Sequence, residues 1–223
     1  MKKTKILSTR KILKSNSKVA QNESVEWSEE DFIAIEFLSF FINHPLDLLL
    51  FTSQNAVESV LKYEKVEDLK AFDCICVGQK TKDLLEQNNF RVLDFAHYAE
   101  ELSQLILEKY THRKFTFFNG NLRRNTLPEL FGQNNISCEE IQVYTTKLLP
   151  KKIEGNFDAV VFYSPSGVKS FLKENKIEHQ VCFCIGTTTA EAIQNVTQNI
   201  ILPPKPTIDS LVETIKEYYR DKN

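Results

Sequence analysis

The stretch Phe51-Thr-Ser-Gln-Asn-Ala-Val-Glu-Ser-Val-Leu-Lys62 recurs in similar form as Phe162-Tyr-Ser-Pro-Ser-Gly-Val-Lys-Ser-Phe-Leu-Lys173, 111 residues later. Two further pairs keep nearly the same separation: Cys74-Ile-Cys-Val-Gly78 with Cys182-Phe-Cys-Ile-Gly186 at 108 residues, and Ala99-Glu-Glu-Leu102 with Ile208-Asp-Ser-Leu211 at 109. Three successive elements at near-constant separation predict that one βαβαβα unit occurs twice. Because a period of about 110 residues is too long for a solenoid, the repeat indicates two similar domains.

Around the repeat, short β-rich runs alternate with amphipathic helical patterns, which favours parallel α/β units. The candidate strands are Lys5–Ser8, Leu48–Thr52, Cys74–Val77, Val92–Phe95, Phe115–Phe118, Ile141–Thr145, Ala159–Tyr163, Cys182–Ile185 and Ile200–Leu202. Apolar residues recur every three or four positions in the candidate helices, which are Ala56–Tyr63, Thr81–Gln87, Ala99–Tyr110 and Ser210–Tyr219. The polar stretch Ile12–Val25 predicts a shortened first helix.

The second copy of the repeat lacks a last strand like Phe115–Phe118, and we expect Lys5–Ser8 to supply it. The sequence therefore predicts two similar flavodoxin-like parallel-sheet domains, one inserted in the other. Residues 1–34 with 148–223 form the discontinuous domain, and residues 38–143 form the inserted one. The crossings at 32–38 and 143–149 are expected to pair as a two-stranded hinge, with a cleft between the domains.

The bulk composition excludes several classes of protein. The net charge of the 223 residues is −2, so no general field attracts nucleic acid or an anionic membrane. No run of about 18 apolar residues is present, and the basic N-terminus lacks the apolar core of a signal peptide. Five cysteines are an odd number, which favours free thiols and a cytoplasmic location. We expect neither nucleic acid nor a membrane as a partner.

Small and polar residues follow five of the predicted strands. The loops are Ser53-Gln54-Asn55, Gly78-Gln79-Lys80-Thr81, Gly120-Asn121-Leu122-Arg123, Ser164-Pro165-Ser166-Gly167 and Gly186-Thr187-Thr188-Thr189. Each is expected to open a helix at the sheet edge where ligands of parallel α/β folds bind, and its free N–H groups suit carboxylate or phosphate. The alternative is ordinary capping, since Ser, Thr and Asn are favoured N-caps in any helix. No GxGxxG or GxxxxGK[ST] motif is present, so neither a dinucleotide nor a nucleoside triphosphate is expected.

Five ordered motifs resemble those of uroporphyrinogen-III synthases. They are Phe51-Thr-Ser-x-Asn-Ala-Val57, Gly120-Asn-Leu-Arg-Arg124 followed by Leu127-Pro128, Val143-Tyr-Thr-Thr146, Ser164-Pro-Ser-Gly-Val168 and Ile185-Gly-Thr-Thr-Thr-Ala190. The resemblance implies a cofactor-free hydro-lyase that acts on hydroxymethylbilane, a linear tetrapyrrole with eight carboxylates. Ring closure would lose water and invert ring D through an azafulvene and a spiro intermediate. The resemblance also implies a monomer that makes at most transient contact with the preceding enzyme of the pathway.

The resemblance assigns roles to particular residues. Tyr144 matches the tyrosine of the family's Val-Tyr-x-Thr motif, and its phenol would assist the departure of hydroxide. A purely structural tyrosine that packs its ring between the domains is the alternative. The expected substrate-binding residues are Arg10, Ser53, Asn55, Gly78, Thr81, Gly120, Asn121, Ser164, Ser166, Gly167, Gly186, Thr188 and Thr189. Of Arg123 and Arg124, one is expected to pair with a helix acid instead.

Some features favour other interpretations. Cys74-x-Cys76 and Cys182-x-Cys184 could suggest zinc, but zinc sites more often use Cys-x2–4-Cys in loops, so buried packing and no metal are expected. Trp27 lies in a polar stretch and is interpreted as a lone packing anchor. A second hypothesis for the whole chain is a non-catalytic two-domain module that binds a polyanionic small molecule, because hinged α/β domains also serve as ligand sensors.

Overall fold

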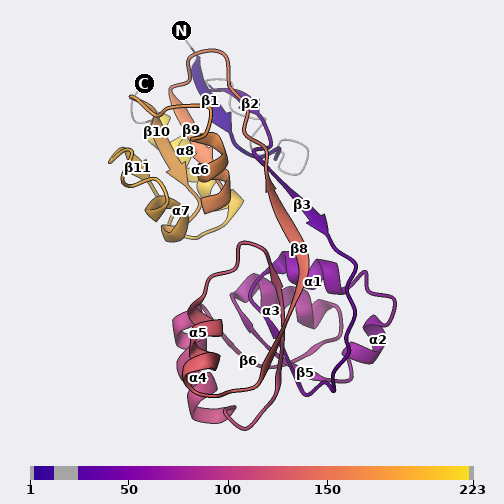
Figure 1. The fold of residues 1–223 in the computed structure, drawn as a ribbon. Helices are drawn as coiled ribbons and strands as arrows, with labels where there is room; N and C mark the ends of the chain where they lie inside the picture. The colour runs from indigo at the N-terminus through magenta and orange to yellow at the C-terminus, as the bar shows by residue number, and fades with distance from the viewer. Residues whose placement is uncertain (1–2, 13–24, 221–223) are drawn as a thin grey trace. The chain divides into compact units, whose positions relative to one another are not determined.

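The computed structural model describes residues 3–12 and 25–220 (Figure 1). Of the shortened helix predicted over 12–25, residues 13–24 lie outside the described part of the chain, and Val25 begins a strand. The chain divides into two units: unit 1 comprises Met1–Ala34 and Lys147–Asn223, and unit 2 comprises Ile35–Thr146. None of the helices among the described residues combines the length and the hydrophobicity needed to cross a membrane.

Unit 1 is built on a parallel sheet whose strands come from both ends of the chain. The strands are β1 (Thr4–Ser8), β2 (Val25–Glu29), β9 (Ala159–Phe162), β10 (Val181–Cys184) and β11 (Ile200–Ile201), in the order β11-β10-β9-β1-β2. Its helices are α6 (Pro165–Phe171), α7 (Thr187–Glu191) and α8 (Ile208–Arg220). All four strand pairs are parallel, and β1 pairs with β9 as the repeat predicts.

Unit 2 contains a six-stranded sheet. Its strands are β3 (Ile33–Phe37), β4 (Leu48–Phe51), β5 (Asp73–Val77), β6 (Arg91–Ala96), β7 (Phe115–Gly120) and β8 (Cys138–Leu148), in the order β3-β8-β7-β4-β5-β6. Strands β4 to β8 pair in parallel, whereas the backbone bonds from Leu38 N to Val143 O and from Leu149 N to Phe32 O join β3 to β8 in antiparallel fashion. Its helices are α1 (Gln54–Val60), α2 (Val66–Leu69), α3 (Gln79–Gln87), α4 (Ala99–Lys109) and α5 (Thr126–Gln133). Helices α1 and α3 pack on one face of the sheet, and α4 and α5 pack on the other. The chain passes between the units within β3 and β8, which are neighbours in this sheet.

The strands of the two sheets occupy corresponding positions, but the chain passes through these positions in a different order. Counted along the chain, unit 1 has the flavodoxin-like order 2-1-3-4-5, whereas strands β4 to β8 of unit 2 have the order 3-2-1-4-5. Strand β1 occupies in unit 1 the place that β7 occupies in unit 2. The point at which strand order reverses therefore lies between β1 and β9 in unit 1, and between β4 and β7 in unit 2. Ligands of open α/β sheets bind at such points.

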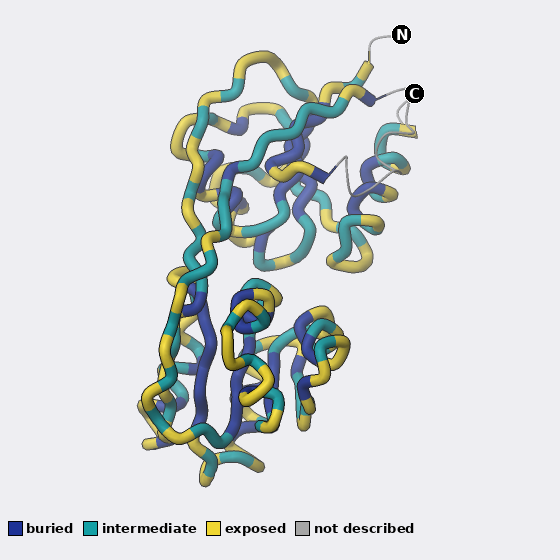
Figure 2. Tube along the Cα trace, turned by 90° about the vertical axis from the view of Figure 1, so that its right-hand side faces the viewer, coloured by how far each residue is buried: buried dark blue, intermediate teal, exposed yellow. Residues whose placement is uncertain are grey.

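The cores consist of the central strands and the helix faces that cover them. Strands β4, β9 and β10 are buried throughout, as their continuous apolar sequences predict, whereas β3 is only partly buried (Figure 2). In unit 2 the stacked rings of Phe51 and Phe118 lie 5.2 Å apart. In unit 1 the ring of Phe162 meets that of Phe171 edge to face at 5.4 Å. Each repeat thus places an aromatic ring from its first strand at the centre of its own core.

Strand β2 was not predicted, and its presence corrects the interpretation of Trp27. The residue is in register with Ile6 of β1 and packs with the apolar residues that lie under α8. Charged and polar residues alternate with Val25 and Trp27, because β2 is an edge strand with one face in solvent. Trp27 is therefore a sheet residue and not an isolated anchor.

One ion pair joins the starts of β4 and β7 and makes unit 2 sensitive to acid. The Asp47 carboxylate accepts hydrogen bonds from Arg113 Nε at 2.7 Å and from Lys114 N at 2.8 Å. The hydrogen bond from Arg113 is the main reason that the pKa of Asp47 lies below its ordinary value. A carboxyl whose pKa falls on folding stabilises the fold above its unfolded pKa of about 3.9, and this contribution is lost as the pH falls through the lowered value.

We expect Asp47→Asn to lower the free energy of unfolding by about 1 kcal/mol or less at neutral pH, since the pair is partly exposed to solvent. The difference from the unmodified protein should shrink as the pH falls below about 4. Urea titrations at several pH values measure it. A difference that stays constant across the acid range would contradict the assignment. Glu67→Gln, which removes an exposed partner of Lys70, serves as the control with little expected effect.

Candidate functional site

The ring of Tyr144 lies directly against Gly120 at the end of β7. The register between the strands runs from Asn119 opposite Gln142 to Gly120 opposite Tyr144, so β8 carries one extra residue there. A Cβ added at Gly120 would lie 2.3 Å from Cζ of Tyr144, which is far below any real contact. Only glycine lets the tyrosine ring occupy this position. Gly120, a predicted binding residue, therefore leaves the space that the ring of Tyr144, the predicted catalytic residue, occupies.

The Tyr144 phenol reaches the start of α1. Tyr144 Oη donates a hydrogen bond to Ser53 Oγ at 3.2 Å, and the same oxygen accepts from Asn55 N at 3.1 Å. Ser53 is the N-cap of α1, as predicted. Ser53 Oγ thus accepts two hydrogen bonds from the protein itself. The hydroxyl proton of Ser53 is still available for donation to another group. The structure brings together four predicted residues from three elements at the reversal point of the unit 2 sheet.

The side chains of Asn121 and Arg123, in the loop after Gly120, both bond to residues of β8. Asn121 Oδ1 accepts from Thr146 N at 2.8 Å, and Asn121 Nδ2 donates to Thr146 O at 3.3 Å. Arg123 pairs with Glu140, which also accepts from Asn119 Nδ2 at 2.7 Å. The partner of Arg123 is therefore an acid of strand β8, so Arg123 is not the arginine of the pair Arg123 and Arg124 that meets a helix acid. These side chains line a hollow of about 430 Å³ beside Gly120, in which the charge of Arg123 is already balanced.

The Gly120 loop does not open a helix directly, contrary to the prediction. Helix α5 begins at Thr126 and has Asn125 at its N-cap. Turn residues fill the interval, because Arg123 N bonds back to Gly120 O at 3.1 Å. The free N–H groups expected here therefore belong to a loop.

The equivalent edge of unit 1 carries a second serine cap. Ser164 Oγ accepts from Gly167 N at 3.1 Å and lies 3.0 Å from Ser166 Oγ. Gly167 is buried, and a Cβ added there would lie 3.4 Å from Ser164 Oγ and 3.8 Å from Thr9 Oγ1. The predicted residues Ser164, Ser166 and Gly167 thus form one turn at the start of α6. Ser53 and Ser164 cap corresponding helices of the two repeats.

A tyrosine that was not assigned to the site lies beside this turn. Ser8 Oγ donates to the carbonyl oxygen of Arg10 and lies 3.0 Å from Tyr163 Oη. Burial raises the pKa of Tyr163, so its phenol stays neutral. Arg10, next to this pair, is exposed. No short-range pattern signals the pair, because Ser8 and Tyr163 are 155 residues apart in the chain.

The remaining predicted residues lie after β5 and β10 and are less well suited to binding. Thr81 and Thr189 are only 5% and 2% exposed, and their N–H groups bond to Gly78 O and Gly186 O. Both threonines are therefore buried in this structure, while Thr188 is partly exposed. Gly78 has φ of +89°, which requires glycine, whereas Gly186 has an extended backbone that any residue adopts.

The paired cysteines are core residues, as predicted. Cys74, Cys76, Cys182 and Cys184 are fully buried, and burial raises the pKa of each thiol to about 12. Thiols with such pKa values remain protonated and unreactive at neutral pH. Within residues 3–12 and 25–220, no group of three or more His, Cys, Asp or Glu side chains is placed to hold a metal ion.

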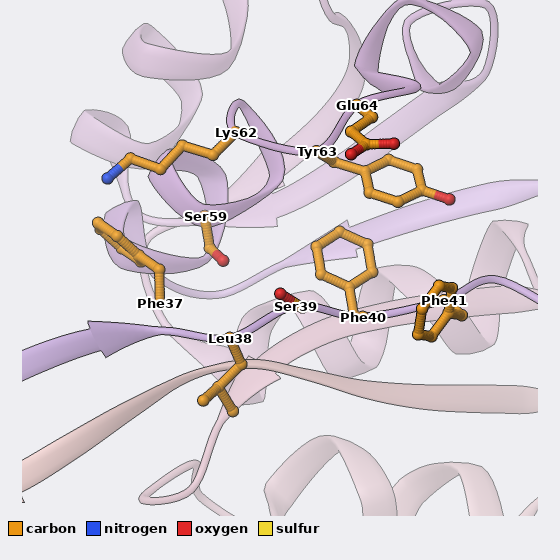
Figure 3. A pocket seen from close by; sticks show the side chains of 9 residues that line it. All are labelled: Phe37, Leu38, Ser39, Phe40, Phe41, Ser59, Lys62, Tyr63 and Glu64. Atoms are coloured by element: carbon orange, nitrogen blue, oxygen red, sulfur yellow. The ribbon is translucent and has the colours of Figure 1, made fainter.

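A separate hollow of about 350 Å³ lies on unit 2 beside the far half of α1 (Figure 3). Aromatic rings dominate its wall, and Phe40 stacks on Tyr63 at 4.6 Å. It carries Lys62 and Glu64, whose charges balance, and it contains neither Tyr144 nor any predicted binding residue. Its chemistry does not match a ligand with many carboxylates.

Comparison with known proteins identifies the family. The family model described as uroporphyrinogen-III synthase HemD matches residues 19–213. A uroporphyrinogen-III synthase from Chlorobaculum parvum is 26% identical over 180 residues, which cover 70% of this chain and 73% of that protein. A porphyrin biosynthesis protein HemD from Ruminiclostridium josui is 22% identical over 191 residues, which cover 76% of this chain and 37% of that protein.

Solved structures show the same fold. The uroporphyrinogen-III synthetase of Helicobacter pylori 26695 aligns with a TM-score of 0.71 at 20% identity and covers 98% of this chain and 100% of that one. A mutant uroporphyrinogen III synthase of Thermus thermophilus aligns with a TM-score of 0.69 at 13% identity, covering 97% and 98%. Since the family model spans most of the sequence, the chain belongs to the uroporphyrinogen-III synthase family.

Proposed function

We propose that the chain acts as a hydro-lyase on hydroxymethylbilane, with Tyr144 as the group that assists the departure of hydroxide. As a member of its family, the chain is an enzyme of porphyrin biosynthesis with uroporphyrinogen-III synthase function. The alternative of a non-catalytic module that binds a polyanion is not favoured, because the matched family is one of synthases.

The proposed reaction begins at the terminal hydroxymethyl carbon. Tyr144 Oη donates its proton to the leaving hydroxyl, which departs as water, while the adjacent pyrrole nitrogen supplies the electron pair that forms the azafulvene. The substituted carbon of ring D then attacks to give the spiro intermediate. Breaking and re-forming the bridge inverts ring D, and the proton released on the last closure restores the phenol. The pyrrole provides most of the driving force, so the protein needs only a positioned donor.

The position of Tyr144 is the single observation that carries this proposal. Its phenol lies at the sheet edge where parallel α/β proteins bind ligands, on a glycine that cannot be replaced without moving it. It also shares Ser53 with the N-terminus of α1, where negative charge is favoured. A donor held at an anion-binding edge suits a substrate whose carboxylates surround the leaving group.

We propose that the serine caps, Arg10 and the exposed backbone N–H groups of these edges bind the carboxylates. Each helix N-terminus would contribute roughly 0.3–1 kcal/mol toward an anion. Holding the bilane folded brings its reacting ends together, and such ordering can lower barriers by up to ~7–11 kcal/mol in well-oriented cases. It would also disfavour direct closure to the type I isomer, which needs no inversion. Buried Thr81 and Thr189 would shape these turns and not touch the substrate.

We further propose that the two units are domains with bounds 1–34 plus 148–223 and 38–143. The division of the chain by contacts supports these bounds. A cytoplasmic monomer is also proposed; the free cysteines, of which Cys138 is only partly buried, suit a reducing compartment. Sedimentation at a mass well above 25.8 kDa would contradict the monomer.

We expect Tyr144→Phe to slow turnover about tenfold, less than the roughly 10²–10⁴ common for general acids, because the pyrrole nitrogen already expels the leaving group. The assay measures the turnover of hydroxymethylbilane and the ratio of type III to type I isomer in its product. Tyr110→Phe is the control, since Tyr110 Oη bonds Asp94 at 2.7 Å and not the site. An unchanged rate in Tyr144→Phe would remove Tyr144 from the mechanism. A product mixture equal to that of the spontaneous reaction would overturn the reaction itself.

A further inference from the structure

The direction of the Tyr144 side chain depends on a bulge in β8. From Phe115 to Asn119 the register with β8 advances residue by residue, and it then skips Val143 so that Gly120 meets Tyr144. An extra residue in one strand turns the side chains that follow it, and such bulges re-aim side chains beside active sites. Val143 points into the core and is fully buried. Whatever holds the backbone at Val143 therefore also fixes the direction of the Tyr144 phenol.

A serine on α1 holds that backbone. Ser59 is 3% exposed, and its Oγ donates to the carbonyl oxygen of Val143 at 2.5 Å. Leu38 N donates to the same oxygen at 2.9 Å. Figure 3 shows the Ser59 hydroxyl on the side of α1 that faces the segment carrying Leu38. Because Ser53 at the start of α1 accepts from Tyr144 Oη, this one helix contacts β8 at two consecutive residues.

Asn121 holds the same strand beyond Tyr144. Both ends of its amide bond the backbone of Thr146, at 2.8 Å and 3.3 Å. The bulged segment is thus fastened before and after Tyr144, from a helix on one side and from the loop after β7 on the other. Gly120 lies under the ring between the two.

The repeat provides an internal comparison for Ser59. Its counterpart 111 residues later is Ser170 on α6, which is also fully buried. Among the residues that the structure describes, Ser170 Oγ has no hydrogen-bond partner. A serine at this place on the helix is therefore compatible with the fold without a bond. Of these two described serines, only Ser59 bonds to a neighbouring strand, and it lies in the repeat that carries Tyr144.

We propose that Ser59 and Asn121 are positioning residues for the reaction, which act through the β8 bulge to hold the Tyr144 phenol in place. The inference rests on the proposed role of Tyr144. Neither residue needs to touch the substrate. Removing either would let the phenol depart from its productive direction, while the remaining edge donors would still bind the carboxylates.

The test is a double-mutant cycle with Tyr144→Phe. Ser59→Ala alone should lower kcat about fivefold with little change in KM, and should raise the share of type I isomer. In the Tyr144→Phe background the same change should have almost no further effect on kcat. Ser170→Ala should stay within about twofold of the unmodified enzyme in both kcat and isomer ratio. Urea titrations of all variants separate loss of fold from loss of positioning.

The outcomes are distinguishable. If Tyr144→Phe slows turnover but Ser59→Ala slows it by the same factor with or without the phenol, the positioning role is wrong. If Tyr144→Phe itself leaves the rate unchanged, the proposed role of Tyr144 fails first. Should Ser59→Ala not fold, Asn121→Ala answers the question, because Asn121 is exposed. A loss in kcat that vanishes without the phenol supports positioning, whereas a raised KM that persists means that Asn121 binds substrate directly.

Discussion

Gly120→Ala is expected to reduce turnover at least as far as Tyr144→Phe and to lower the free energy of unfolding by about 1–3 kcal/mol. The new methyl group would lie 2.3 Å from Cζ and 2.5 Å from Cε2 of Tyr144, so the ring must move away from residue 120. The phenol would then lose Ser53, its hydrogen-bond partner. One added methyl group would thus displace the Tyr144 phenol and also strain β8 at this residue.

Gly132→Ala is the matched control for this experiment. Gly132 lies exposed within α5, and a Cβ added there meets nothing within 4 Å. Alanine is the better helix former, so this variant should gain roughly 0.5–1 kcal/mol and keep its activity. Steady-state kinetics and urea midpoints of both variants are compared with those of the parent. A Gly120→Ala enzyme with full turnover would show that the ring position does not matter.

Phe51→Ala is expected to cost about 3–5 kcal/mol of stability, and to cost it in unit 2 alone. Phe51 is fully buried and stacks on Phe118, and it meets Phe90 edge to face at 6.0 Å. No other side chain can fill the space of a lost ring in a core packed this closely. The effect should appear as an early unfolding step of one unit if the two units are domains.

The repeat supplies the reciprocal variant, Phe162→Ala, in the core of unit 1. Trp27 is the only tryptophan of the chain and lies in β2 of unit 1, so its fluorescence reports that unit, whereas circular dichroism reports both. Phe51→Ala should shift part of the dichroism and leave the fluorescence midpoint unchanged. Phe162→Ala should lower the fluorescence midpoint. If both probes move together in both variants, the chain unfolds as one body and the domain proposal is wrong.

The repeat made most of the architecture predictable from sequence. Matching residues such as Ser53 and Ser164 fixed corresponding helix starts, and the missing last strand pointed to the pairing of β1 with β9. The end of α3 also follows from its sequence, because Asn89 adopts φ of 64°, a left-handed conformation that asparagine tolerates after a helix. These features depend on local backbone chemistry, which a sequence displays directly.

The errors arose where burial depends on neighbours distant in sequence. An edge strand as short and polar as β2 has too few apolar residues to register as a strand. Threonine is common at helix starts, and this pattern does not show that Thr81 and Thr189 are buried in the folded chain. Tyr144 could be found from its motif, but the bulge that aims it could not. The serines at 59 and 170 were visible as part of the repeat, although only the structure shows that one of them holds β8.

The place of β1 in the sheet of unit 1 has a consequence for synthesis on the ribosome. Lys5 bonds Asp158, 153 residues further along, at the start of the β1–β9 pairing. At translation rates of about 5–20 residues per second, the nascent strand waits roughly 8–30 s for this partner. All of residues 35–146 emerge in that interval. The inserted half of the protein can therefore fold while the sheet of the outer half still lacks the strands that pair with β1 on its β9 side.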